Sequence, residues 1–149
     1  MLPGYVTHMI RLAANISTLF TELPLMQRIE AASKAGFGAI ECQFPYAEDA
    51  AQLAAHVKAA GVQWVLMNAP PGRTEAGERG IASLPGRERD LDDSIETALR
   101  YAVAVGCRNV HVMAGLLRTG SDRARHIDQF IAGIARGAER LATVGATVL

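Results

Sequence analysis

The sequence repeats one local pattern, in which a helix-like segment ends in small residues, a glycine follows, and an apolar strand-like segment comes next. The glycines in this position are Gly36, Gly61, Gly106 and Gly145. Glycine readily adopts the left-handed conformation that ends many helices, because it has no Cβ to clash with the backbone. Alternating helices and strands favour a parallel sheet covered by helices. The pattern therefore predicts an α/β fold built from βα units.

Short apolar segments are predicted as strands, and longer segments with apolar residues at helical spacing are predicted as helices. The strands are expected at residues 11–17, 38–44, 63–69, 109–115 and, as a beginning only, 146–149. The helices are expected near residues 23–35, 47–60, 87–105 and 123–144. The core-facing side of the last helix is expected to consist of Ile127, Phe130 or Ile131, Ile134, Ala138 and Leu141.

Chain length limits which α/β fold is available. A complete (β/α)8 barrel needs about 250 residues, and this chain has 149. After Gly145 the sequence enters a strand and stops at Leu149, whereas a doubly wound domain of this size would end with a helix. We therefore expect a partial (β/α)8 TIM barrel with about four βα units and the start of a fifth strand. Residues 1–10 are expected to be a leader and residues 11–149 the N-terminal half of the barrel domain. A complete doubly wound binding domain is the alternative fold.

Composition argues against several classes of protein. Fifteen basic and fifteen acidic residues leave no formal net charge, which argues against a nucleic-acid groove or a basic membrane contact. No apolar run approaches the roughly 18 residues that cross a bilayer, and the first residues lack the features of a signal peptide. Cys42 and Cys107 lie far apart in apolar segments, which indicates reduced structural thiols. We expect a cytoplasmic protein that binds neither nucleic acid nor membrane.

Polar residues occur where the predicted strands end, which is where parallel α/β folds place their functional groups. Alternation along the strands puts Asn15, Glu41 and His111 on the side that would face the barrel interior. Asn68 ends the third predicted strand. The residues expected on the opposite side, toward the helices, are Ile16, Ile40 and Val112.

Each of these polar residues also has a structural explanation. A carboxylate in an apolar strand needs a partner, so Glu41 has a structural hydrogen-bonding role, contacts a substrate, or acts in catalysis or metal binding. His111 is either a satisfied interior histidine or a residue that contacts substrate and handles protons. Asn15 and Asn68 are either turn residues or substrate contacts. The residues alone leave these alternatives open.

The segment 68–80 is long, charged and rich in glycine, and it follows the third predicted strand. It contains no phosphate-binding glycine motif. It is either a solvated loop or a lid over an active site, since long loops after barrel strands often have that role. In a lid, Arg79 or Arg73 would bind a substrate carboxylate through paired N–H donors.

The spacing of histidine and cysteine residues indicates neither a metal site nor a nucleophile. The histidines His8, His56, His111 and His126 show no HxxxH or HExxH spacing. His8 falls in the leader, and His56 and His126 are expected on exposed sides of helices. Cys42 is expected on the helix-facing side of its strand, so no Cys–His pair is predicted.

Five segments of the chain resemble the hydroxypyruvate isomerase family. They are RLAANISTLFTE (11–22), GFGAIECQFPY (36–46), NAPPG (68–72), AGERGIASLPGRE (76–88) and NVHVMAG (109–115). This family belongs to the xylose-isomerase-like TIM barrels and includes the 2-oxo-tetronate isomerases. The resemblance runs in order from about Arg11 to Leu149, and segment 76–88 is its most specific part. It departs at residues 73–75, where Arg-Thr-Glu stands in place of the family's usual Asp-Trp-Ala.

The resemblance implies isomerisation of hydroxypyruvate to 2-hydroxy-3-oxopropanoate (tartronate semialdehyde). A carboxylate would remove a proton beside the carbonyl and a second acid would return it to the neighbouring carbon. A divalent metal, Mg or Mn, would stabilise the enediolate charge. The family's catalytic glutamates and metal ligands lie on later strands, so the resemblance places them beyond Leu149 and leaves this chain without them, inactive alone. The residues expected to bind the 2-oxo acid substrate are Asn15, Glu41, Asn68, Arg79 and His111.

Two other functions stay open. One is isomerisation of a 2-oxo-tetronate, which is a longer 2-oxo acid. The other is a non-catalytic half-barrel assembly module, in which exposed edges at the first and fifth strands join copies of the chain into a homo-oligomer.

Overall fold

Residues 10–149 are described in the computed structural model of the chain. The expected leader, including His8, therefore lies outside the described residues except for Ile10. Within residues 10–149, no helix combines the length and the apolar character that crossing a membrane requires.

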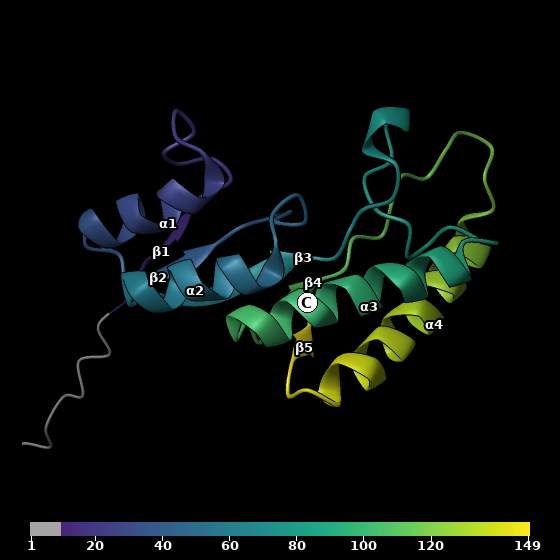
Figure 1. Ribbon diagram of the computed structural model, residues 1–149. Helices are drawn as coiled ribbons and strands as arrows, with labels where there is room; N and C mark the ends of the chain where they lie inside the picture. The colour runs from purple at the N-terminus through teal and green to yellow at the C-terminus, as the bar shows by residue number, and fades with distance from the viewer. Residues whose placement is uncertain (1–9) are drawn as a thin grey trace, which may run out of the picture.

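Strands and helices alternate along the chain (Figure 1). The strands are β1 (Ala13–Asn15), β2 (Ala39–Glu41), β3 (Gln63–Asn68), β4 (Asn109–His111) and β5 (Thr147–Val148). The helices are α1 (Leu25–Lys34), α2 (Ala50–Ala60), α3 (Glu88–Val105) and α4 (Arg123–Ala142), and a short 3-10 turn, η1 (Thr74–Ala76), follows β3. The predicted βα units and fifth strand are confirmed. The paired parts of the strands are shorter than predicted, because their flanking residues leave the sheet as loops.

The sheet is parallel throughout, and its strand order follows the chain as β1-β2-β3-β4-β5. A doubly wound sheet reverses its strand order at a switch point, and this sheet has no reversal. The doubly wound alternative is therefore wrong. Sequential parallel strands with a helix after each one are the arrangement of a (β/α)8 barrel, and the partial barrel fold is confirmed.

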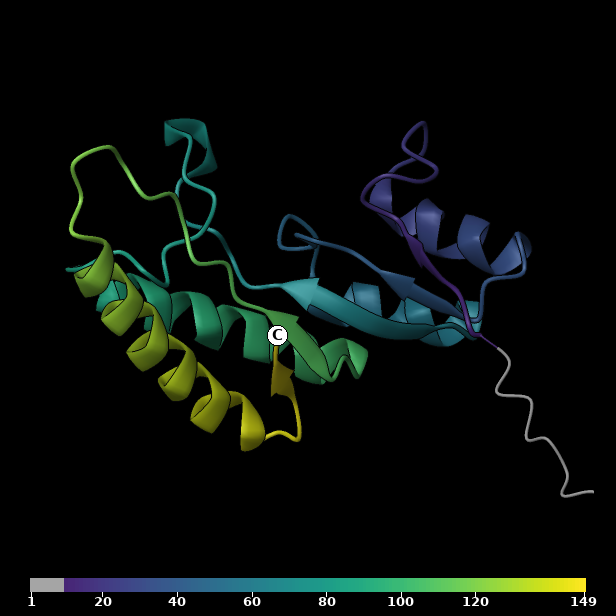
Figure 2. The ribbon, with the colours of Figure 1, turned by 180° about the vertical axis from the view of Figure 1, so that it is seen from behind.

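All four helices lie against one face of the sheet. Figure 1 shows α2 and α3 in front of the strands, and Figure 2, from behind, shows the strands in front of these helices. The predicted direction of the helix-facing residues is confirmed, since Ile16 and Ile40 are fully buried and Val112 is 4% exposed. The other face carries the half-buried side chains of Glu41 and His111 and is not covered by any helix of the described part.

The four predicted glycines end the helices as expected. Gly36, Gly61, Gly106 and Gly145 have positive φ angles of 89°, 66°, 71° and 71°, which are the left-handed values that favour glycine. Each helix is thus turned back toward the next strand by a residue that the sequence pattern identifies.

The predicted core-facing side of α4 is partly wrong. Leu141 is fully buried and Phe130 packs against the core, but Ile127 and Ile131 are 45% and 62% exposed, and Ala138 is also exposed. The stripe of apolar residues follows the helical period, but part of it faces away from α3. Periodicity identified the helix but did not identify which of its sides meets the neighbouring helix.

Two glycines lie at the contact of α4 with α3, which the ion pairs Arg136–Asp92 and Arg140–Glu96 also join. A Cβ added at Gly133 would lie 2.7 Å from Cδ2 of Leu91, and one at Gly137 would lie 3.1 Å from Cδ1 of Ile95. Such distances leave no room for a larger residue, because packed carbon atoms lie about 3.5–4.0 Å apart. The missing side chains therefore let the two helices approach closely, and Leu91 and Ile95 fill the space.

Candidate functional site

Four of the five predicted substrate-binding residues lie in two aligned pairs on neighbouring strands. Asn15 of β1 is aligned with Glu41 of β2, and Asn68 of β3 is aligned with His111 of β4. Partners in register on adjacent strands point to the same face of a sheet. The strands thus bring these side chains together as two pairs.

The pair of Asn68 and His111 is held firmly in place. Asn68 is only 8% exposed, and its Oδ1 lies 3.3 Å from Nδ1 of His111. The main-chain N–H of Asn68 donates to the carbonyl of Gln43 at 3.0 Å, and its carbonyl accepts a 2.5 Å hydrogen bond from the Tyr46 hydroxyl. Burial raises the pKa of Tyr46, so the phenol stays protonated as a donor. Both the backbone and the side chain of Asn68 are therefore fixed.

The pair of Asn15 and Glu41 is held less firmly. Oδ1 of Asn15 accepts a hydrogen bond from the main-chain N–H of Ser17 at 3.0 Å, which is the turn role that was one of its two predicted explanations. Glu41 is half-buried, and its carboxylate makes no hydrogen bond or ion pair with any residue in the range 10–149. The buried partner that one explanation of Glu41 required is not found among these residues.

A pocket of about 390 Å³ lies where β2, β3 and β4 end, and we call it the strand-end pocket. Asn68 and Arg79 both line it, so the loop after β3 returns an arginine to the end of its own strand. Asn15, Glu41 and His111 are not among its lining residues. The other residues that line the pocket are Gln43, Phe44, Pro71, Thr74, Gly77, Glu78 and Met113.

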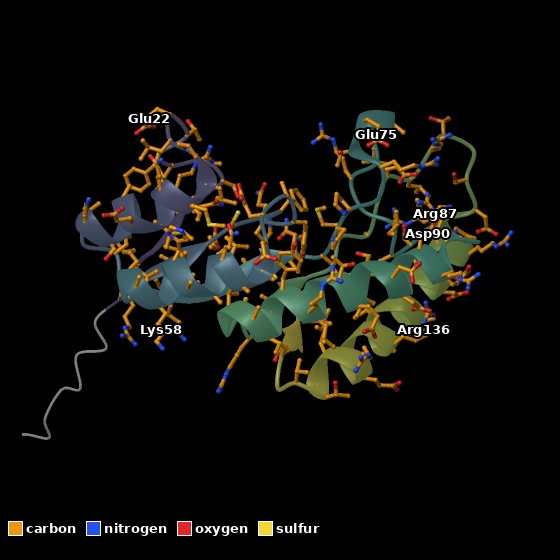
Figure 3. The ribbon with its side chains drawn as sticks, in the orientation of Figure 1. Glu22, Lys58, Glu75, Arg87, Asp90 and Arg136 are labelled. Carbon is orange, nitrogen blue, oxygen red and sulfur yellow. The ribbon has the colours of Figure 1, made fainter. Side chains whose placement is uncertain are left out.

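The β3–α3 loop (residues 69–87) is fastened by the carboxylate of Glu78. This carboxylate accepts hydrogen bonds from Nη1 and Nη2 of Arg87 at 2.6 and 3.2 Å, and from the main-chain N–H of Arg73 at 2.6 Å. Arg87 also pairs with Asp90, and Figure 3 shows both side chains near the start of α3. The hydrogen bonds from Arg87 and then from Arg73 lower the pKa of Glu78 to about 2. Glu78 is therefore an anion at neutral pH.

The same loop is fastened a second time through its backbone. The N–H of Gly80 donates to the carbonyl of Pro71 at 2.9 Å, and Gly80 forms an antiparallel bridge with Ala114 after β4. A Cβ at Gly80 would lie 2.5 Å from the carbonyl oxygen of Met113, and φ of Gly80 is 114°. Only glycine fits here, since both the space and the backbone angle exclude a side chain. The loop is an ordered wall of the strand-end pocket.

The two arginines predicted as alternative substrate anchors have different surroundings. Nη2 of Arg73 lies 3.4 Å from the Glu78 carboxylate, so this arginine has an acidic partner. Arg79 is exposed, lines the strand-end pocket, and forms no ion pair with any other residue that the structure describes. The geometry thus favours Arg79 over Arg73 as the arginine available to a ligand in this pocket.

The remaining histidines and cysteines do not form a centre of their own. Among residues 10–149, no group of three or more His, Cys, Asp or Glu side chains is placed to hold a metal ion. Cys42 and Cys107 are free and buried, and burial raises the pKa of both thiols, which fits structural roles. His56 is exposed as predicted, but His126 is only half-exposed and its Nδ1 is buried. The expectation of an exposed His126 is therefore wrong.

Sequence reasoning missed the ion pair that orders the loop. Glu78 and Arg87 both lie in segment 76–88, which carries the most specific part of the resemblance, but nothing in their spacing indicated that they meet. It also missed Tyr46 as the group that fixes Asn68. The only feature of the sequence that could have pointed to Tyr46 is its position shortly after β2.

Residues 29–149 match the family model described as Xylose isomerase-like TIM barrel. The chain belongs to this family. This agrees with the sequential parallel sheet and confirms the resemblance noted in the sequence. Curated relatives that are similar to the chain come from bacteria and from animals.

A 2-oxo-tetronate isomerase of Cupriavidus necator is 45% identical over 141 residues, covering 95% of this chain and 54% of that protein. A human protein named "Putative hydroxypyruvate isomerase" is 45% identical over 115 residues, covering 76% of this chain and 42% of that protein. A crystal structure from Brucella melitensis, described as AP endonuclease, family 2, is 44% identical with a TM-score of 0.91, covering 94% of this chain and 54% of that one. The chain spans about half the length of the curated relatives it matches.

Proposed function

We propose that the chain forms one half of the active site of an isomerase that interconverts hydroxypyruvate and 2-hydroxy-3-oxopropanoate. One observation carries the proposal, namely the strand-end pocket that is lined by both the fixed Asn68 and Arg79, an arginine without an acidic partner among the described residues. Such a pocket suits a small acid with polar groups next to its carboxylate. Relatives named as isomerases of 2-oxo acids support the same reaction class.

Arg79 is proposed to bind the carboxylate of the substrate. A guanidinium offers two parallel N–H donors that match the two oxygens of a carboxylate. The β3–α3 loop that carries Arg79 is already ordered by the Glu78–Arg87 ion pair and by the bridge at Gly80. Binding then costs little conformational entropy in this loop, which favours affinity.

Asn68 and His111 are proposed to hydrogen-bond the oxygens of the substrate next to the carboxylate. With Nδ1–H of His111 donating to Oδ1 of Asn68, the Nε2 atom of His111 is an acceptor for a substrate hydroxyl. The pair of Asn15 and Glu41 lies on the same face of the sheet, two strands away. It is proposed to contact only an acid longer than hydroxypyruvate, at the end that is farther from Arg79.

The reaction moves one proton from the hydroxymethyl carbon to the neighbouring carbon by way of an enediolate, while the hydroxyl proton passes from the hydroxymethyl oxygen to the former carbonyl oxygen. The described residues are proposed to bind and orient the substrate, and none of them is assigned as the base. They also do not fit the divalent metal that the resemblance implies, because they contain no cluster of ligands for it. We assign the base and the metal ligands to the other half of the barrel, and we derive no step through a metal.

The test is a calorimetric titration of the 149-residue chain with hydroxypyruvate. Arg79→Gln is expected to weaken binding about tenfold or more, because one charge-assisted pair is lost. Lys58→Gln removes an equal charge from an exposed position on α2 and is expected to change nothing. Unchanged affinity in Arg79→Gln would refute the assigned anchor.

A coupled isomerase assay with Mg²⁺ or Mn²⁺ tests whether the base and the metal ligands lie outside this chain. The chain alone is expected to show no turnover, since no base is assigned within it. Clear metal-dependent turnover by the chain alone would contradict that assignment.

A 2-oxo-tetronate is the second candidate substrate, because the relative with that activity name is similar over 95% of this chain. This acid is longer, so its far end would extend toward Asn15 and Glu41. Replacing Asn15 by Ala is then expected to weaken binding of the 2-oxo-tetronate and to leave binding of hydroxypyruvate unchanged. The same loss for both acids would argue against this arrangement.

A non-catalytic assembly module is the proposal of a different class. β1 and β5 each pair with a single neighbouring strand in the described part of the chain. Apolar side chains near both edges are exposed, with Leu12 at 70% and Leu149 at 57%. Free edges of this kind favour association of copies. Sedimentation velocity is expected to show a dimer under this proposal, and a stable monomer at high concentration would exclude it.

A further inference from the structure

A second pocket, of about 340 Å³, lies beside the strand-end pocket. The two share Gly77, Glu78 and Arg79, and the second is otherwise formed by the end of the β3–α3 loop and by the segment 116–126. We call it the arginine pocket, because Arg79, Arg87 and Arg118 all line it. Its lining residues come from two consecutive connections of the fold and, in the case of His126, from the first turn of α4.

The arginine pocket holds an excess of positive charge. Glu78 is the one carboxylate among its lining residues. This carboxylate is paired with Arg87, which in turn also pairs with Asp90. Arg79 and Arg118 make no ion pair with any of residues 10–149. The whole chain has no formal net charge, so this local positive excess is balanced by acidic residues elsewhere in the chain.

A buried polar atom without a partner belongs to one of the residues that line the same pocket. His126 lies in the first turn of α4 and lines the pocket, and its Nδ1 is buried with no hydrogen-bond partner among the described residues. Buried polar atoms in folded proteins are nearly always paired, so an unpaired one calls for an explanation such as a bound group. The hydroxyl of Ser121 is a further polar group of the lining.

We infer that the arginine pocket binds the phosphate group of a small phosphorylated molecule. Two guanidinium groups without acidic partners, an imidazole and a hydroxyl come from separate segments, and a tetrahedral phosphate has more acceptor oxygens for them than a planar carboxylate has. Leu84, Pro85 and Leu116 provide apolar lining for a short carbon chain. The volume is within the range of small-molecule pockets, about 300–1,000 Å³.

The test titrates the 149-residue chain with inorganic phosphate and with glycerol 3-phosphate, followed by NMR and calorimetry. Both are expected to bind saturably and to shift signals of residues 76–87 and 116–126. Arg118→Gln is the diagnostic variant, because Arg118 lines this pocket but not the strand-end pocket. It is expected to weaken binding of phosphate about tenfold or more.

Lys58→Gln is the matched control, since it removes one positive charge at a site that Figure 3 shows at the far end of the molecule from Arg87. It is expected to bind phosphate as the unchanged chain does, and circular dichroism confirms that both variants are folded. Equal losses in the two variants, or no saturation, would mean an unspecific charge effect and would overturn the inference. Tighter binding of acetate than of phosphate would overturn the assignment to phosphate.

The outcome is separable from that of the isomerase proposal. Arg118→Gln is expected to leave binding of hydroxypyruvate unchanged, because that acid is assigned to the strand-end pocket. Loss of phosphate binding with normal binding of hydroxypyruvate supports a phosphate site that differs from the strand-end pocket although the two share Arg79. Loss of both in Arg118→Gln would contradict a separate phosphate site.

Discussion

The uncovered face of the sheet holds its polar residues differently at its two ends. At β3 and β4, Asn68 is 8% exposed and is bonded through its side chain, its N–H and its carbonyl. At β1 and β2, Glu41 is half-buried and its carboxylate has no hydrogen bond to a described residue. The Asn68 side chain at the first end is thus positioned before any ligand arrives, whereas the Glu41 side chain at the second end is positioned only by its strand.

Neighbouring loops account for the difference. The β3–α3 loop lies across the segment after β4 and is joined to it by the bridge between Gly80 and Ala114. The loop after β1 is also held, because Arg28 donates to the carbonyls of Ile16 and Leu23 at 3.0 and 2.7 Å. Those bonds fix backbone but do not reach the Glu41 side chain. Order around a side chain therefore depends on what packs beside it, and not on its strand alone.

The largest expected effect comes from Gly80→Ala. The added Cβ would meet the Met113 carbonyl at 2.5 Å in a backbone with φ of 114°, so we expect a loss of stability of about 2–4 kcal/mol. Gly77→Ala is the matched control, because Gly77 has a φ of 78° but open space around it. It is expected to cost only about 1–2 kcal/mol. Urea unfolding measures both, and equal losses would show that the close approach at Gly80 has no importance.

Removing the hydroxyl of Tyr46 tests how firmly Asn68 is held. Tyr46→Phe deletes the 2.5 Å hydrogen bond to the Asn68 carbonyl and is expected to cost about 1–3 kcal/mol, because a buried acceptor loses a partner. The NMR signals of Asn68 and His111 are expected to shift. A variant as stable as the original chain would show that this end of the face is no better held than the other.

Acid is expected to release the β3–α3 loop only at strongly acidic pH. The pKa of Glu78 is lowered from its ordinary value of 4.5 to about 2. A carboxyl group with a lowered pKa stabilises the folded state fully above its unfolded pKa, and this contribution is lost as the pH falls from about 4.5 through 2. The amide signal of Arg73, which donates to Glu78, is expected to titrate near pH 2. Glu78→Gln should abolish this titration, and a midpoint near 4.5 would contradict the ion pair.

The smallest effect is expected at the loosely held end. Glu41→Gln removes a charge that makes no hydrogen bond to a described residue, so stability is expected to change by no more than about 0.5 kcal/mol. Urea unfolding of this variant beside Tyr46→Phe compares the two ends directly. A loss for Glu41→Gln as large as that for Tyr46→Phe would remove the contrast between them.

Features that depend on local sequence were predictable. The positive φ angles of Gly36 and Gly61, and the burial of Ile16 and Ile40 on the helix-facing side, follow from the backbone freedom of glycine and the two-residue period of a strand. The prediction that Asn68 ends the third strand was also confirmed. These properties involve only a few consecutive residues and the class of fold.

Features that depend on which segments meet were not predictable. Glu78 and Arg87 are brought together by the path of an irregular loop, which has no period to read. Ile131 has the spacing of a core residue and is 62% exposed, because α4 approaches α3 through Gly133 instead. His126 was expected on an exposed side for a similar reason, since the fold of segment 116–126 decides what covers it.

The position of α4 depends on the side chains that α3 places against Gly133 and Gly137. Because α4 contributes no side chain at Gly133 and Gly137, the size of Leu91 and Ile95 sets the separation of the two helix axes. A Cβ at Gly137 would also lie 3.6 Å from Cγ2 of Val148 in β5. A bulkier or smaller residue on α3 would accordingly shift α4 together with β5, so substitutions on one helix can adjust the position of the sheet edge that β5 forms.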